Sequence, residues 1–275
     1  MLLTLYALAG LCIGSFMNVV VYRLPAMVLR EQQPDRFSGF PAKLSLAFPR
    51  SYCPLCHQTL GALQLLPLIG WVWQRGHCKY CGGVIPLRYP LMELLHAVLF
   101  VLIAWRTPSP EMALIFCLFS SLLIALATID YCYMLLPDAL TLPLLWGGLL
   151  LNATSFGLVS LHSSLYGAVG GYLSLWIIQQ LYRFFRHKEG MGGGDLKLLA
   201  ALGAWLGVES INMIALTASL LMLALCILRG GESKDRYLPF GPALIAGAGI
   251  WLLCQMQVLT PSITRLIHSL TFPSF

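Results

Sequence analysis

The sequence predicts an all-α polytopic membrane protein with about eight transmembrane helices and one small polar domain between the first two. Of its 275 residues, 58% are apolar types and only 10% are charged, against roughly 45–50% and 25% in soluble domains. The apolar residues gather in runs close to the roughly 20 residues that cross a bilayer. This composition excludes a soluble globular enzyme, a disordered chain and a small disulfide-stapled secreted domain. We expect no nucleic-acid binding, because the net charge of +6 is more simply a topology signal.

The first apolar run covers residues 1–22 and is read as a retained helix rather than a signal peptide. No basic residue precedes Arg23, whereas a signal peptide begins with basic residues. A polar domain at 23–88 follows. A bundle of about seven helices then covers residues 89–260, and residues 261–275 form a short periplasmic tail. The bundle's apolar runs are 89–105, 112–129, 139–158, 163–182, 196–208, 211–228 and 239–258. The sixth span of the chain is short and the fourth contains glycines, so a count of seven spans stays open.

The basic residues predict the orientation of the spans. With eight spans, fifteen of the seventeen Lys and Arg residues fall on one side, and only Arg106 and Arg265 fall on the other. Basic loops face the cytoplasm. We therefore expect a multi-pass protein of the bacterial inner membrane whose N-terminus is periplasmic and whose 23–88 domain is cytoplasmic.

Four cysteines in the polar domain predict a structural zinc site. Cys53, Cys56, Cys78 and Cys81 form a C-x2-C-x21-C-x2-C pattern. Four thiolates in two short knuckles suit tetrahedral Zn²⁺, and the reducing cytoplasm makes two disulfides a poor alternative. A redox pair and a chance pattern remain open, as does replacement of one ligand by His57 or His77. Gly82 and Gly83 supply the tight turn that a knuckle needs. The other five cysteines lie in or beside apolar spans and are read as packing residues.

Four acids lie in or beside the apolar spans, where an ionisable group is expensive and therefore a functional candidate. They are Glu93, Asp130, Asp138 and Asp195, and the expected topology puts all four near the cytoplasmic edge. Two aspartates held together in a semi-dry site share a proton. Such a dyad can activate water for peptide hydrolysis.

Each aspartate also has a structural interpretation. Asp138 is well placed to cap the helix that follows it, and Asp195 opens a helix too. Asp130 ends a span, where a carboxylate opposes the helix dipole, and this misfit favours a catalytic role. Glycines Gly192 and Gly194, just before Asp195, allow close backbone approach and positive φ, as an extended substrate strand would require.

The chain resembles the bacterial type IV prepilin peptidases, which are membrane aspartic peptidases. The resemblance covers nearly the whole length. It rests on six blocks in order: Gly14–Pro25, the two cysteine pairs, Arg88–Leu95, Ile129–Asp138, the Gly-x-Gly-Asp run ending at Asp195, and Pro239–Pro242. The glycine–aspartate run alone would be a weak signal. All six blocks together, with a matching topology, are highly specific.

The resemblance implies a catalytic pair, assigned here to Asp130 and Asp195, with Asp138 as the alternative partner of Asp195. Asp138, Gly192, Gly194 and Lys197 are then expected to shape the site. The resemblance also implies a zinc-binding cysteine tetrad. Finally, it implies N-methylation of the new amino terminus with S-adenosyl-L-methionine, for which the sequence contains no soluble methyltransferase motif. Asn18, Arg23 and Glu93 are the candidate methyltransferase or substrate region, although helix packing, interfacial anchoring or a buried polar contact would also explain them.

The expected substrates are type IV prepilins or type II secretion pseudopilins, whose basic leader meets a hydrophobic helix at the cytoplasmic membrane face. An ion-coupled transporter is an alternative, because acids and glycine-broken helices also mark carriers. Carrier acids lie near the midplane, however, whereas these lie at one edge. A non-catalytic assembly subunit of a secretion system is the second alternative. The sequence carries no feature that indicates an oligomeric state.

Overall fold

The computed structural model describes residues 1–37, 39–41, 43–107, 109–187, 190–228 and 238–255. Within these ranges the regular structure is helical, and the only strand-like features are two isolated bridges. The expected tail at 261–275 lies outside them, as does the expected basic loop with Arg229, Lys234 and Arg236. The chain divides into two compact units, Met1–Ala125 and Leu126–Phe275.

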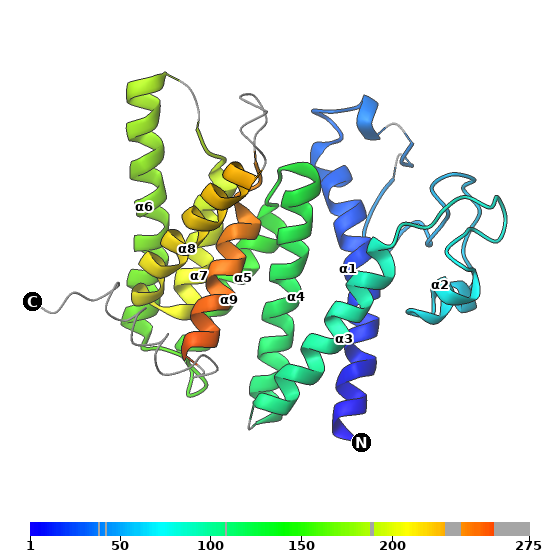
Figure 1. Ribbon diagram of the computed structural model, residues 1–275, viewed down its shortest axis with the longest axis horizontal. Coiled ribbons are helices and arrows are strands. Elements are labelled where there is room, and N and C mark those ends of the chain that lie inside the picture. The colour runs from blue at the N-terminus through cyan, green and yellow to red at the C-terminus, as the bar shows by residue number, and fades with distance from the viewer. Residues whose placement is uncertain (38, 42, 108, 188–189, 229–237, 256–275) are drawn as a thin grey trace, which may run out of the picture. The chain divides into compact units, whose positions relative to one another are not determined.

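Eight long helices match the eight apolar runs one for one (Figure 1). They are α1 (Leu2–Leu29), α3 (Arg88–Arg106), α4 (Pro110–Tyr133), α5 (Asp138–Asn152), α6 (Leu161–Arg186), α7 (Gly193–Leu206), α8 (Val208–Leu228) and α9 (Gly241–Gln255). Among the described residues, four of these helices are long and apolar enough to cross a membrane, namely α1, α3, α4 and α8, and α9 is a shorter apolar helix. The all-helical membrane class is therefore confirmed, while the crossing by all eight helices stays a prediction.

The first unit is built on α1 and α3, which pack closely along two glycines. A Cβ at Gly10 would lie 2.7 Å from the Cα of Ala97, and a Cβ at Gly14 would lie 2.7 Å from the Cα of Glu93. Two glycines four residues apart lie on one helix face, so the two backbones can approach without side chains between them. This pairing sets Glu93 level with Gly14 of α1.

The first helix is longer than the apolar run from which it was expected. It continues past Tyr22 to Leu29 and includes Arg23 and Pro25. The guanidinium of Arg23 donates to the carbonyl oxygens of Ser45 and Leu46 at 3.0 and 3.3 Å. The charge is thus satisfied inside the fold, which is why a buried arginine does not end the helix.

The polar domain folds with little regular structure. It contains two 3-10 turns, Asp35–Phe37 and Ala62–Leu65, and the short helix α2 (Ile69–Trp73). A domain with so few helical turns has a small apolar core, so a bound metal would supply much of its folding free energy.

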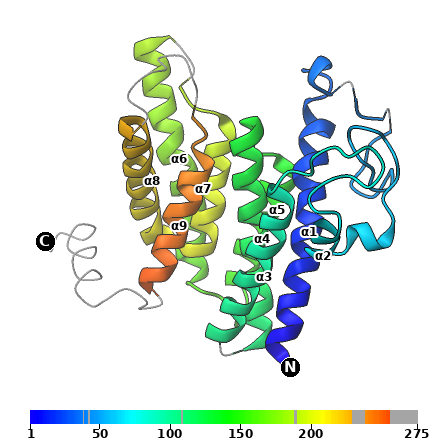
Figure 2. The same cartoon turned by 45° about the vertical axis from the view of Figure 1, so that its right-hand side comes forward.

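The second unit is a helical bundle (Figure 2). Its most buried helix is α7. All its residues from Asp195 to Leu206 are buried except Lys197. Glycines allow this helix to lie deep: a Cβ at Gly203 would overlap the carbonyl oxygen of Gly167 on α6. Such close contact fixes the position of α7 and therefore of the residue that opens it.

A buried asparagine ties three helix ends of this bundle together. Nδ2 of Asn152, at the end of α5, donates to the carbonyl oxygen of Ala204 at 2.8 Å. Its Oδ1 accepts from the backbone N–H groups of Leu158 and Val159 at 2.7 and 3.1 Å. One side chain thus satisfies the last turn of α7 and the connection that leads into α6.

Candidate functional site

Two buried aspartates of the second unit lie close enough to interact electrostatically. Asp130 stands near the end of α4 and is 6% exposed, and Asp195 is the third residue of α7 and is 9% exposed. Both lie in apolar surroundings, where like charges repel strongly. The structure therefore places the two residues of the predicted dyad within electrostatic range of each other, while their catalytic role stays a prediction.

The carboxylate of Asp130 is oriented by the start of α9. The backbone N–H of Gly241 donates to Oδ2 of Asp130 at 2.9 Å, across 111 residues of sequence. A Cβ at Gly241 would lie 2.7 Å from the same oxygen. Only glycine allows this approach, so Gly241 is part of the site. Sequence reasoning assigned it no role, although it lies in the Pro239–Pro242 block that carries the resemblance.

Asp195 is positioned by a backbone hydrogen bond, and its side chain does not cap α7. Its N–H donates to the carbonyl oxygen of Gly192 at 3.3 Å, and Gly192 is the N-cap residue of α7. Its Oδ1 is buried and accepts no hydrogen bond within the described part of the chain. The capping interpretation of Asp195 is therefore not supported. A carboxylate in the first turn is still stabilised by the helix dipole.

Among the glycines just before Asp195, Gly194 is needed for space, and none is needed for positive φ. Gly192 has a φ of −73°, and none of the glycines from 190 to 194 is among the described glycines with positive φ. A Cβ at Gly194 would lie 2.7 Å from the Cβ of Leu136. Gly194 thus allows a close approach by Leu136, while the approach of a substrate strand stays a prediction. The expectation of positive φ is wrong for this run.

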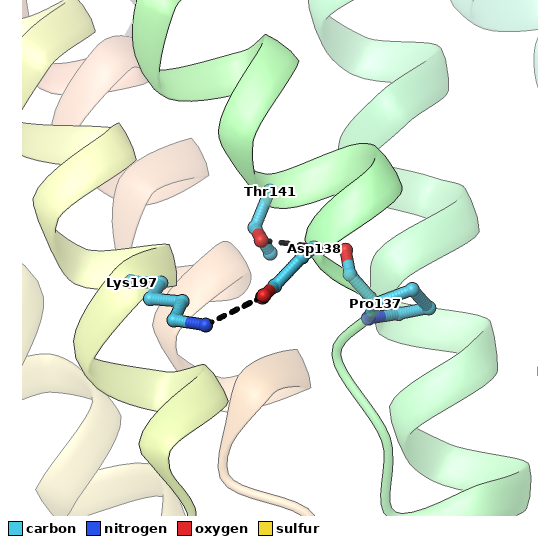
Figure 3. Close-up of polar contacts among 4 residues, drawn as sticks. All are labelled: Pro137, Asp138, Thr141 and Lys197. Carbon is cyan, nitrogen blue, oxygen red and sulfur yellow. Dashed lines mark hydrogen bonds and ion pairs between the residues drawn. The ribbon is translucent and has the colours of Figure 1, made fainter. Parts of the chain in front are cut away.

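Asp138 forms an ion pair with Lys197 and does not cap α5 (Figure 3). Nζ of Lys197 lies 2.6 and 2.8 Å from the two carboxylate oxygens of Asp138. Helix α5 begins at Asp138 itself, and its N-cap residue is Pro137. The expected capping role is therefore wrong. The pair connects α5 to α7 two residues after Asp195, and its side chains are 56% and 37% exposed.

The four predicted metal ligands of the first unit come together. The Sγ atoms of Cys53, Cys56, Cys78 and Cys81 all lie within 4.8 Å of one another. Four converging thiolates fit a tetrahedral soft-ligand site. Neither His57 nor His77 belongs to the cluster, and both are exposed.

The two knuckles are built alike, which explains why the tetrad closes. The carbonyl oxygen of Cys53 accepts from the N–H of His57, and that of Cys78 accepts from the N–H of Gly82, both at 2.9 Å. His57 and Gly82 have φ values of 57° and 70°. The expected turn at Gly82 is correct, and His57 occupies the same place in the other knuckle. Backbone N–H groups of Cys81 and Tyr80 also donate to the Cys78 thiolate and lower its pKa to about 7.

The three residues of the candidate methyltransferase region make contacts inside the first unit. Nδ2 of Asn18 donates to the carbonyl oxygen of Tyr89 at 3.0 Å, and Oε2 of Glu93 accepts from the N–H of Leu68 at 2.7 Å. Arg23 holds Ser45 and Leu46, as described above. Oδ1 of Asn18 is buried and has no hydrogen-bond partner among the described residues.

Comparisons with known proteins agree with this division. Residues 8–107 match the model of the bacterial peptidase A24 N-terminal domain, and residues 117–227 match that of the type IV leader peptidase family. A prepilin leader peptidase/N-methyltransferase of Aeromonas hydrophila is 44% identical over 262 residues, covering 91% of this chain and 90% of the relative. The chain belongs to the type IV leader peptidase family.

Two further relatives of the same printed name extend the likeness across this family. The protein from Dickeya chrysanthemi is 45% identical, covering 90% of this chain and 91% of its own, and the one from Neisseria gonorrhoeae is 40% identical, covering 90% and 88%. No solved structure gives a match. The cysteine tetrad lies within the first matched domain and the two buried aspartates within the second.

Proposed function

We propose that this protein is a membrane aspartic endopeptidase that removes the basic leader of type IV prepilins or type II secretion pseudopilins. After cleavage it methylates the new amino terminus. The observation that carries the proposal is the buried pair Asp130 and Asp195, which interact within the domain that matches the leader peptidase family. The relatives named above bear both activities in their names.

The two carboxylates would act on one water molecule. One takes a proton from the water as its oxygen attacks the scissile carbonyl carbon, and the other donates its proton to the carbonyl oxygen. The resulting tetrahedral diol breaks its C–N bond: the amine leaves with a proton returned by the first carboxylate, and a diol hydroxyl gives its proton back to the second carboxylate as the new carboxyl group forms. No covalent intermediate with the enzyme forms.

Several contacts support these roles. The N–H of Gly241 fixes one oxygen of Asp130. The buried Oδ1 of Asp195 makes no hydrogen bond to any described residue, and it is therefore an acceptor that can bind the attacking water. The ion pair of Asp138 and Lys197 links α5 to α7, the helix that carries Asp195, and we assign it a positioning role.

The cysteine tetrad would hold structural Zn²⁺. Its four thiolates lie within 4.8 Å of one another, as a closed tetrahedral site requires. A closed site has no open position for substrate, so the ion would act on folding and not on peptide cleavage.

Methylation would take place in the first unit, with S-adenosyl-L-methionine supplying an electrophilic methyl group to the new amine. The buried free acceptor Oδ1 of Asn18 supports a polar ligand in this region. Arg23 and Glu93 are used in contacts with the polar domain, so we assign them to shaping the region and not to the transfer itself.

We place both activities at the cytoplasmic face of the inner membrane, with the N-terminus in the periplasm. The bias of fifteen basic residues to one side supports this orientation. The position of Asp195 in the first turn of α7 supports a site at the end of the bundle, which is where a leader meets its hydrophobic helix.

The test is incubation of the purified protein with a prepilin, with and without S-adenosyl-L-methionine, followed by mass analysis of leader loss and methyl gain. Asp130→Asn and Asp195→Asn should each abolish leader loss, because an amide cannot exchange the proton. Asp138→Asn keeps both buried carboxylates and serves as the matched control, with reduced but measurable cleavage. Full cleavage by Asp195→Asn, or none by Asp138→Asn with the other two active, would refute the assignment.

A further inference from the structure

The short helix α2 presents a fully apolar face that nothing in the described part of the first unit covers. Ile69, Val72 and Trp73 are 60%, 65% and 85% exposed. Residues at i, i+3 and i+4 lie on one side of a helix, so the three form one patch, called here the α2 face. A large aromatic group and two β-branched side chains gathered in one place indicate an interaction site.

The outward direction of the α2 face is fixed by contacts on the opposite side of the helix. Gly70 is buried, and a Cβ there would overlap the carbonyl oxygen of Gln64. The indole N–H of Trp71 donates to the carbonyl oxygen of Ile85 at 3.2 Å. The helix is thus seated on its own domain by Gly70 and Trp71 and cannot bury the α2 face by turning over.

The depth of α2 can be measured along the paired helices α1 and α3. Glu93, which accepts from the N–H of Leu68 just before α2, is level with Gly14 of α1. Glu93 is five residues beyond the start of α3, about 8 Å along the helix. The start of α2 therefore lies beside the transmembrane part of α3 and not beyond its end.

The segment of the polar domain that contains Ser45 and Phe48 lies at a different depth along α1 from that of α2. Ser45 is held by Arg23, which is nine residues and about 14 Å further along α1 than Gly14. Phe48 is tied to Ser45 by a backbone hydrogen bond of 2.8 Å. The polar domain therefore extends from outside the start of α3, at Phe48, to inside it, at α2.

The surface of α3 at the level of Glu93 is itself apolar and exposed. Leu91, Leu94 and Leu95 are 59%, 47% and 43% exposed, and α3 is one of the four candidate spans. In a membrane these side chains contact lipid. The start of α2 is tied to the same level of α3 through Leu68, so its exposed apolar face lies at the depth of these lipid-contacting side chains.

We propose that α2 is an interfacial anchor that inserts Ile69, Val72 and Trp73 into the lipid of the leaflet in which α3 begins. Tryptophan favours the boundary between acyl chains and headgroups. Arg75, two residues after Trp73, is exposed and would meet anionic headgroups at the edge of the patch. The anchor holds the metal-binding domain down on the membrane, beside the helices that carry Asn18 and Glu93.

The test uses Trp73 as its own probe in the full-length protein. Wild type and Trp73→Phe are placed in nanodiscs of phosphatidylcholine and phosphatidylglycerol, with or without bromine on the acyl chains. The difference between their tryptophan emission spectra reports Trp73. We expect a spectrum shifted to short wavelength, quenched by the brominated lipid and insensitive to aqueous iodide.

The matched control moves the indole to residue 48, in the part of the polar domain that lies outside the start of α3. In the double variant Trp73→Phe, Phe48→Trp the probe sits at a site that is 72% exposed in the structure. Its difference spectrum, taken against Trp73→Phe, should lie at long wavelength and be quenched by iodide and not by bromine. Metal content equal to wild type verifies that both variants fold.

The proposal is overturned if Trp73 gives the long-wavelength, iodide-quenched signal. It is also overturned if Trp73 becomes shielded only after a prepilin is added, because the α2 face would then be a substrate surface. These optical readouts do not depend on peptidase or methyltransferase activity.

Discussion

Replacing Gly241 by alanine should damage catalysis without touching an ionisable group. The added Cβ would lie 2.7 Å from Oδ2, 3.2 Å from Cγ and 3.4 Å from Cβ of Asp130. Ordinary van der Waals contact begins at 3.4 Å, so the nearest oxygen must move by 3.4 − 2.7 = 0.7 Å. Because Cγ is also too close, the whole carboxylate has to move and not only rotate.

That displacement sets the expected size of the effect. A misplacement of about 1 Å in a catalytic group can cost roughly 100-fold in rate. We expect Gly241→Ala to lower kcat for leader removal by somewhat less than this, on the order of 30-fold. KM should change little, because Gly241 acts on Asp130 and not on the leader.

The assay is the rate of leader loss at saturating and limiting prepilin, followed by gel shift or mass spectrometry. Gly249→Ala is the matched control on the same helix, since a Cβ at Gly249 meets no atom within 4 Å. It should keep full activity and gain up to about 1 kcal/mol from helix propensity. Wild-type kcat in Gly241→Ala would refute the claim that this contact positions Asp130. Equal losses in the two variants would point to general damage to α9 instead.

Three other perturbations have expected outcomes. Asn152→Ala leaves buried backbone groups without hydrogen bonds, and each lost partner costs roughly 1–3 kcal/mol of stability. The melting temperature in detergent should therefore fall. An unchanged melting temperature would show that water replaces the amide. Gly203→Ala forces α6 and α7 apart and should destabilise the bundle by about 1–3 kcal/mol. Gly147→Ala is the control and should not destabilise it, because the added Cβ meets only an ordinary contact at 3.6 Å. Equal melting temperatures for the two variants would contradict the close packing at Gly203. Cys78→Ser should lose bound zinc and make the polar domain sensitive to protease, and removal of zinc by a chelator should have the same effect. Replacing the exposed Cys226 by Ser is the control and should leave the metal content unchanged. Full zinc content in Cys78→Ser would exclude the tetrad as the zinc site.

Local sequence signals predicted the elements well because they act over a few residues. Each apolar run became a helix, since chain in lipid must satisfy its backbone hydrogen bonds internally. The C-x2-C spacing predicted two knuckles, and each closes through hydrogen bonds within six residues. Helix ends were predicted less well. Arg23 did not end α1, because carbonyl groups more than 20 residues away bind its charge.

The acids show where sequence reasoning fails. Asp138 has the local environment of a capping residue, yet it pairs with Lys197, 59 residues away. The glycines before Asp195 suggest unusual backbone angles, yet none of those from 190 to 194 has a positive φ, and Gly194 packs closely against Leu136. In both cases a tertiary contact between residues distant in sequence took the place of the local role that the sequence favoured.

The sequence by itself determined the membrane class, the eight helical segments, the cysteine tetrad and the family. These depend on composition, periodicity and short spacings, which are properties of the chain. Only the tertiary structure decided that Gly241 orients Asp130, that Lys197 pairs with Asp138 and that α2 is tied beside α3. The partners in these contacts are far apart in sequence, 111 residues in the case of Asp130 and Gly241. Their meeting depends on how closely the helices pack, which the glycines at 14, 203 and 241 permit. The sequence shows these glycines but not the helix against which each one packs.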